Sequence, residues 1–362
     1  MSGATAGTGT VAVFIYLALM MVIGASAATR IKSAADYIVA GRSMGFWFFV
    51  MLMLGATTSG MTLIGVAGLG FVGGWPTFWE QLFVPFACAF TIIVYGYKLH
   101  AVCREKHFMT IQDYLAYRYQ SPVAVRAISS LAMLATSLIY LVGQYTAVAI
   151  VLKWLLGVGE AQALFIGAFI VIVYVLLGGL YAVAWTTLVQ GIIIVAGVLV
   201  IAPAVIQSAG GPALVNRTLA AIDPSLLAPA FPQVHPPAAD YAFCTPLFIV
   251  SFALLLGIGL GSSPHIAHNV LTVRDRRTFR WAPLAVFLLY LPIMYLVKMS
   301  GMAARALAAT GQIAVSRPDD ALLAAVQYAL PQAAWPIFAI VVLAAVMSTT
   351  DRLLIVIGTS VG

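Results

Sequence analysis

Long apolar segments dominate this sequence and restrict it to very few kinds of fold. Nine can be recognised, and each is long enough for a helix that crosses the hydrocarbon core of a bilayer, which needs ~20 residues. They cover residues 11–28, 45–72, 77–98, 125–156, 161–180, 184–207, 243–263, 281–308 and 334–358. Only 8% of the residues are charged and 63% are hydrophobic, whereas soluble domains contain about 25% charged residues. The chain is therefore predicted to be an all-α polytopic membrane protein.

The basic residues give the orientation of these segments. If the N-terminus lies outside, 12 of the 18 Lys and Arg residues fall in cytoplasmic connections, as the positive-inside rule requires. Arg30 and Lys32 follow the first apolar segment, whereas a cleaved signal peptide carries its positive charge in front. The net charge of +7 then reflects topology in the lipid bilayer, and we predict no nucleic-acid partner.

Two connections have recognisable features of their own. Thr110 precedes Asp113 by three residues, which predicts a short interfacial helix that starts there. The outer connection 209–246 is rich in Pro, Gly and Ala and is predicted to be a loop.

Two apolar segments are poorly suited to form uninterrupted helices. Segment 45–72 contains several glycines and a hydroxyl cluster at 57–60, and a second interruption lies at 257–264. Irregular backbone near the bilayer midplane is tolerated where it lines a cavity, and paired interrupted helices point to a transporter binding site. The alternative is that the small residues only let helices pack closely.

Segment 334–358 carries adjacent hydroxyls, Ser348 and Thr349, followed by the carboxylate of Asp351. On a helix the carbonyl of Ala345 lies one turn before these hydroxyls, so three oxygens can converge on half of a site for a hard cation. In the alternative interpretation the hydroxyls bond back to carbonyls of their own helix. The spacing by itself favours this second interpretation.

Four motifs, at 35–43, 178–186, 264–266 and 344–349, resemble those of the sodium:solute symporter family and occur in the expected order. The resemblance implies a leucine-transporter-like fold with inverted repeats in a single transmembrane domain, 1–362. A peripheral helix, 11–28, would precede a first repeat, 45–207, and a partial second repeat, 243–362. Because that second repeat would be incomplete, the chain is expected to be a fragment that inserts in the membrane but does not perform coupled transport alone.

The resemblance also implies an ion site. Its oxygens would be the backbone carbonyls of Gly55, Thr58 and Ala345 and the hydroxyls of Ser348 and Thr349. Sodium would be the coupling ion, with no organic cofactor; sodium rather than a proton follows from the resemblance alone. Helix 45–72 would supply the half of the shell that helix 334–358 lacks.

The chain departs from the family pattern near this site. The family often has Asp where this chain has Thr187, which would change how the ion passes to the cytoplasm. The family usually has a small residue where this chain has Arg352, which could pair with Asp351 and alter the inner gate.

We expect the solute to bind between segments 45–72, 125–156 and 243–263. Gln144 is a polar residue in an apolar segment that could bond either the solute or a neighbouring helix, and both possibilities stay open. The few charges favour a neutral or zwitterionic solute. The candidate solute contacts are Ser59, Thr62, Gln144, Phe252 and Ser262.

The predicted function is sodium-coupled uptake of a small organic solute by alternating access, in a bacterial inner membrane. One alternative is a transporter-like sensor module of a signalling protein, and another is a non-functional fragment. No Ser/His/Asp, metal or phosphate-loop constellation is present in the sequence, so we predict that the chain is not an enzyme.

Overall fold

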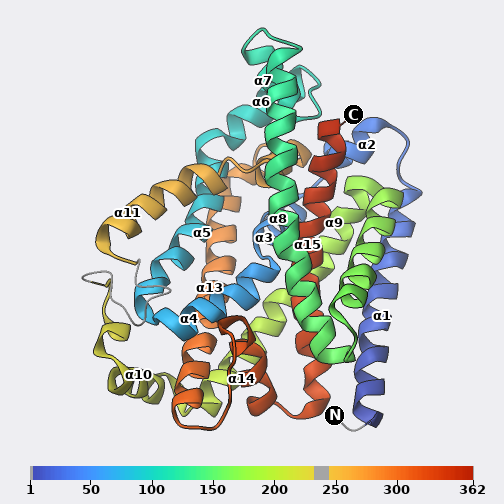
Figure 1. Ribbon diagram of the computed structural model, residues 1–362. Helices are drawn as coiled ribbons and strands as arrows, with labels where there is room; N and C mark the ends of the chain where they lie inside the picture. The colour runs from blue at the N-terminus through green and yellow to red at the C-terminus, as the bar shows by residue number, and fades with distance from the viewer. Residues whose placement is uncertain (1–2, 232–243, 362) are drawn as a thin grey trace.

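The computed structural model describes residues 3–231 and 244–361, and this part of the chain is helical almost throughout (Figure 1). It contains no β-strand; an isolated bridge joins Met44 to Val273. The main helices are α1 (Gly3–Ala28), α2 (Ala34–Val39), α3 (Phe46–Thr57), α4 (Val66–Gly73), α5 (Phe78–Thr91), α6 (Tyr97–Glu105), α7 (Ile111–Arg118), α8 (Ala124–Leu156), α9 (Glu160–Ser208), α10 (Gly211–Ile222), α11 (Pro246–Leu254), α12 (Pro264–Ala267), α13 (Thr278–Ala309), α14 (Ala321–Ala329) and α15 (Trp335–Val361). Short helical segments connect several of them: the π-helical η2 (Met61–Gly65), η4 (Ile92–Gly96) and η6 (Leu255–Leu260) and the 3-10 helix η7 (His268–Thr272).

Within the described residues, six helices are long and apolar enough to cross a bilayer, and two pairs of shorter helices qualify as bent spans. The bent pairs are Phe46–Thr57 with Met61–Gly73, at 63°, and Pro246–Leu260 with Pro264–Thr272, at 53°. Both interruptions predicted from the sequence are thus present. Together these spans account for eight of the nine predicted segments, and the ninth, 161–180, forms the first arm of α9.

Helix α9 must reverse direction to fit a membrane. Its 49 residues would extend about 74 Å if straight, more than twice the ~30 Å hydrocarbon core. The turn is at Gly179, which has φ 48° and ψ −147°. A Cβ atom there would lie 2.5 Å from the ring of Tyr37, so both the backbone conformation and the contact with α2 require glycine.

Helix α2 is held in place by its N-terminal cap. The hydroxyl of Ser33 accepts the backbone N–H of Asp36, whose carboxylate accepts the backbone N–H of Lys32 at 3.0 Å and the Ser33 hydroxyl at 2.9 Å. The bonds to the carboxylate lower the pKa of the Asp36 carboxyl below its ordinary value, and the bond from the Lys32 backbone has the largest effect. The cap fixes the start of helix α2, and this helix places Tyr37 against the turn of α9.

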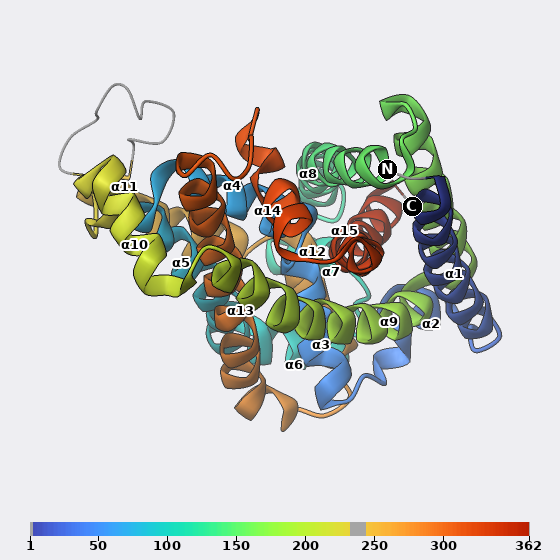
Figure 2. The ribbon, with the colours of Figure 1, turned by 90° about the horizontal axis from the view of Figure 1, so that it is seen from below.

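The helices form two groups with the broken helix between them. Helices α1, α8 and α15 lie together on one side, and α5, α10, α11 and α13 lie on the other, while α9 runs from the first group across the molecule to α10 (Figures 1 and 2). Helix α3 contacts α9, α13 and α15, and α15 also contacts α8 and α9. The end of α3 and the middle of α15 therefore meet inside the molecule.

The two predicted connections have different outcomes. The short helix is confirmed as α7, with Thr110 and Asp113 forming a capping box. The loop prediction for 209–246 is wrong over α10, because Val215 and Leu219 lie one turn apart and are both fully buried. Residues 232–243 of that connection lie outside the described part.

Candidate ion and solute site

The break in the first bent span frees a backbone carbonyl. Helix α3 ends at Thr57, and Thr58 adopts an extended conformation with φ −84° and ψ 98°. In a continuous helix the carbonyl of Gly55 would accept the N–H of Ser59, but that N–H donates instead to the hydroxyl of Thr62 at 3.0 Å. The Gly55 carbonyl is therefore available to a partner outside its own helix.

That partner is α15. The hydroxyl of Ser348 donates to the carbonyls of Gly55, at 3.1 Å, and Ala345, at 3.0 Å. The hydroxyl of Thr349 donates to the carbonyls of Gly55, at 2.9 Å, and Thr58, at 3.2 Å. The structure thus brings together all five residues that the sequence assigned to an ion site. Every one of them is buried.

The chemistry of this cluster suits a hard monovalent cation. It consists of three carbonyl oxygens and two hydroxyl oxygens, all neutral, and oxygen ligands are those preferred by such ions. Each hydroxyl can rotate so that a lone pair, rather than its proton, faces the centre of the cluster. The bond from Ser348 to Ala345 is the back-bonding that the sequence also allowed, so both interpretations of this segment are present together.

Close approach of the helices depends on Gly55. A Cβ atom at this position would lie 2.5 Å from the methyl carbon of Thr187 on α9 and 3.1 Å from Cβ of Ser348. Thr187, at the position where a carboxylate was expected, therefore packs against the cluster through its methyl group. Its buried hydroxyl has no hydrogen-bond partner among the described residues.

Two charged side chains follow the cluster on α15. Asp351 is fully buried and accepts the hydroxyl of Thr186 at 3.4 Å. Arg352 is 1% exposed, and none of its guanidinium nitrogens has a hydrogen-bond partner in the part of the chain that the structure describes. The Arg352 guanidinium therefore donates no hydrogen bond to the Asp351 carboxylate.

Three of the candidate solute residues lie together beside the break. The hydroxyls of Ser59 and Thr62 are 3.3 Å apart, and the amide oxygen of Gln144 accepts the N–H of Gly60 at 3.1 Å. The amide nitrogen of Gln144 is buried without a hydrogen-bond partner among the described residues. Gln144 therefore bonds a neighbouring helix through its oxygen and retains an unused donor.

The other two candidates lie elsewhere on the second bent span. Phe252 stacks on Phe248, with ring centroids 5.2 Å apart, and lines a pocket of about 340 Å³ together with Trp79 and Glu80. Ser262 is exposed at the break. None of the recorded contacts of the described residues joins either one to Ser59 or Gln144, and their roles stay predictions.

Comparison with known proteins identifies the relationship. The model of the family described as "Sodium:solute symporter family" matches residues 37–361. The chain belongs to the sodium:solute symporter family. The predictions of the family and of an all-α membrane bundle are thereby confirmed.

Individual symporters show how far this similarity extends. The sodium/pantothenate symporter of Haemophilus influenzae is 26% identical over 348 residues, which cover 94% of this chain and 69% of that protein. The sodium/proline symporter of Escherichia coli strain K12 is 29% identical over 201 residues, which cover 54% of this chain and 40% of that protein. The chain spans about half of the length of four other curated relatives that it matches.

A solved structure shows the fold. It is described as a substrate-bound outward-open state of a Na+-coupled sialic acid symporter, and it superposes with a TM-score of 0.81 at 16% identity. The match covers 97% of this chain and 73% of that one. This chain therefore has the leucine-transporter-like fold.

Residues that stabilise the two helix breaks were not recognised in the sequence. The hydroxyl of Tyr290 on α13 donates to the carbonyl of Thr57 at 2.7 Å. The hydroxyls of Thr91, at 2.7 Å, and Tyr95 both donate to the carbonyl of Gly261 at the second break. Hydroxyls inside otherwise apolar segments are the signal that could have indicated them, because such groups need partners in a membrane interior.

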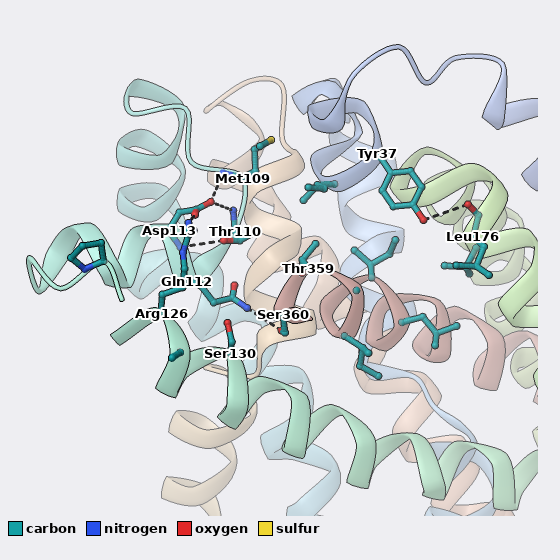
Figure 3. Close-up of a pocket in the computed structure, with 18 of the residues that line it drawn as sticks. Tyr37, Met109, Thr110, Gln112, Asp113, Arg126, Ser130, Leu176, Thr359 and Ser360 are labelled. Carbon is teal, nitrogen blue, oxygen red and sulfur yellow. Dashed lines mark hydrogen bonds and ion pairs between the residues drawn. The ribbon is translucent and has the colours of Figure 1, made fainter. Parts of the chain in front are cut away.

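A large cavity of the chain lies away from the candidate site. It has about 1020 Å³ and is formed by α2, α7, α8, α9 and the end of α15 (Figure 3). Its polar end carries the ion pair between Asp113 and Arg126, and Tyr37 stands at the opposite end (Figure 3). None of the predicted sodium or solute residues lines it.

Proposed function

We propose that this chain forms the ion and solute site of a secondary transporter that couples uptake of a small organic solute to sodium by alternating access. The observation that carries the proposal is the meeting of broken helix α3 with α15 through five buried neutral oxygens. Relatives described as sodium/pantothenate and sodium/proline symporters support sodium as the ion.

Sodium would bind to the carbonyls of Gly55, Thr58 and Ala345 and to the hydroxyls of Ser348 and Thr349. Five neutral ligands compensate the desolvation of one positive charge without a carboxylate, which favours binding weak enough for release. Since the ligands come from two helices, the ion stabilises the arrangement in which α3 and α15 are in contact. This is the differential affinity that a coupling ion needs.

The solute would bind next to the ion. Ser59 and Thr62 follow the break directly, and the unused amide donor of Gln144 lies beside them. Phe252 and Ser262 would contribute from the second bent span when it closes. If ion and solute favour the same state, each raises the affinity of the other by the same factor.

The proposed organisation is one transmembrane domain over 1–362, with the peripheral helix 11–28, the first repeat 45–207 and a partial second repeat 243–362. The bent spans support it, because each is the first span of its repeat. We also propose that the N-terminus lies outside a bacterial inner membrane, as the basic connections favour. The protein that contains this chain acts as a transporter and not as an enzyme.

Solute uptake into proteoliposomes tests this function. Radiolabelled neutral and zwitterionic solutes are screened with and without an inward sodium gradient, using the protein that contains this chain. For a transported solute, the change S348A/T349A removes two of the five ligands, and a hydrogen bond to a charged group contributes about 1.5–3 kcal/mol. The sodium concentration for half-maximal uptake should therefore rise at least about ten-fold.

The control is Thr359→Ala on the same helix, which removes a hydroxyl that only bonds back to Val356 at 3.1 Å. Uptake that responds equally to S348A/T349A and to this control would reject the ion site. Uptake that is independent of the sodium gradient for every solute would reject sodium coupling itself.

A further inference from the structure

An apolar groove runs along the outside of the chain between two helices that are long and apolar enough to span a membrane. It has about 750 Å³ and lies between α5–α6 and the start of α13. Its floor is buried and consists of Ala89, Ile92 and Phe279. The exposed rings and side chains that form its walls belong to Phe86, Ile93, Tyr97, Trp281 and Leu284.

One end of the groove is positively charged. Arg276 lies over the ring of Tyr97, at 5.5 Å from the centroid, and Arg280 lies over the ring of Trp281, at 5.7 Å. Both arginines are exposed, and neither makes an ion pair with any residue in the described part of the chain. Aromatic stacking holds each guanidinium at the groove while its N–H donors stay available.

We propose that this groove binds an anionic phospholipid. The phosphate would lie between Arg276 and Arg280, since the guanidinium fork matches phosphate oxygens, and one acyl chain would lie along the floor over Ile92 and Phe279. The occupant comes from the bilayer because both walls belong to spanning helices. Tyr97 and Trp281 are of the ring types that sit at the level of the headgroups.

The charged end makes the site selective. Apolar walls do not distinguish one lipid from another, because every lipid offers the same hydrocarbon. The arginines distinguish lipids by their headgroups, and each arginine is expected to raise the preference for an anionic over a zwitterionic headgroup about five-fold. The occupied groove also supports the core, because the ring of Phe279 packs on Phe49 of α3, with centroids 5.7 Å apart.

Native mass spectrometry of the purified full-length protein tests the proposal. The protein in detergent is titrated with dioleoyl phosphatidylglycerol or dioleoyl phosphatidylcholine, and bound lipid is counted. We expect one phosphatidylglycerol to be retained in preference to phosphatidylcholine, and R276Q/R280Q to remove this preference. The matched control R274Q/R277Q deletes the same charge from the same segment but leaves the groove intact, since neither residue lines it.

Three results would overturn the proposal. Equal retention of both lipids by the unmodified protein would show that the groove is not selective. Equal loss of phosphatidylglycerol in the two double variants would show that the overall charge of residues 274–280, rather than the groove, attracts the lipid. Displacement of the lipid by millimolar glycerol phosphate, without its acyl chains, would contradict the role of the apolar floor.

Discussion

Replacement of Gly55 by alanine should disrupt the ion site without removing any of its oxygens. The added Cβ would lie 2.5 Å from the methyl carbon of Thr187, whereas ordinary contacts begin at 3.4 Å. One of the two helices must therefore move by about 1 Å, and overpacking of this kind typically costs about 1–3 kcal/mol. If that cost falls on the contact between α3 and α15, sodium affinity should decrease by about 5- to 150-fold.

The assay is the sodium dependence of thermal unfolding, because an ion that binds only the folded protein raises its unfolding temperature. Gly65→Ala is the matched control: it lies in the same bent span with φ −66°, and nothing lies within 4 Å of the added Cβ. It should leave the sodium dependence unchanged and stabilise the helix by about 0.5–1 kcal/mol. The reasoning is refuted if both variants respond to sodium alike.

A second substitution can rescue the first. Thr187→Ser removes the methyl carbon that the new Cβ would meet and leaves the 3.1 Å contact with Ser348. The double variant G55A/T187S should therefore recover part, but not all, of the sodium response. No recovery would mean that Gly55→Ala acts through something other than this contact.

Three further predictions concern substitutions of Tyr290, Gln144 and Asp36. Tyr290→Phe removes the donor to the Thr57 carbonyl and should lower the free energy of unfolding by about 1–3 kcal/mol, measured by denaturation in detergent. Gln144→Leu should weaken solute binding more than sodium binding, because the lost amide faces Gly60 rather than the ion ligands; isothermal titration with each would separate the two. Asp36 has a lowered carboxyl pKa, so its contribution to stability is present above its ordinary pKa of about 4 and is lost below. Asp36→Asn should therefore be less stable than the unmodified protein at neutral pH, and the difference should shrink as pH falls below 4.

The broken helices could be predicted from the sequence because their cause is local. Glycines and hydroxyl side chains weaken a helix wherever they occur together, as at 57–60, and a membrane interior leaves few other uses for them. The hydroxyls of Ser348 and Thr349 could likewise be placed one turn after the carbonyl of Ala345 by spacing alone. Their convergence on Gly55 required the family resemblance, since nothing in either segment specifies its partner.

Contacts between helices could not be predicted from the sequence for the same reason. Tyr290 is one hydroxyl in a long apolar segment, and its bond to Thr57 depends on how α13 crosses α3. Arg352 follows Asp351 directly, which suggested a pair, but neighbouring residues on a helix point about 100° apart. Helix α10 was missed because Pro and Gly in 209–246 outweighed the buried pair Val215 and Leu219.

Direct measurement of bound sodium tests the central claim most sharply. Equilibrium dialysis of the purified protein against 22Na+ counts the ions per chain, with potassium as the competing ion. The account predicts a saturable site that potassium does not occupy, formed by Gly55, Thr58, Ala345, Ser348 and Thr349, and loss of one bound ion per chain in S348A/T349A but not in Thr359→Ala. Retention of that ion, with unchanged affinity, in S348A/T349A would contradict it.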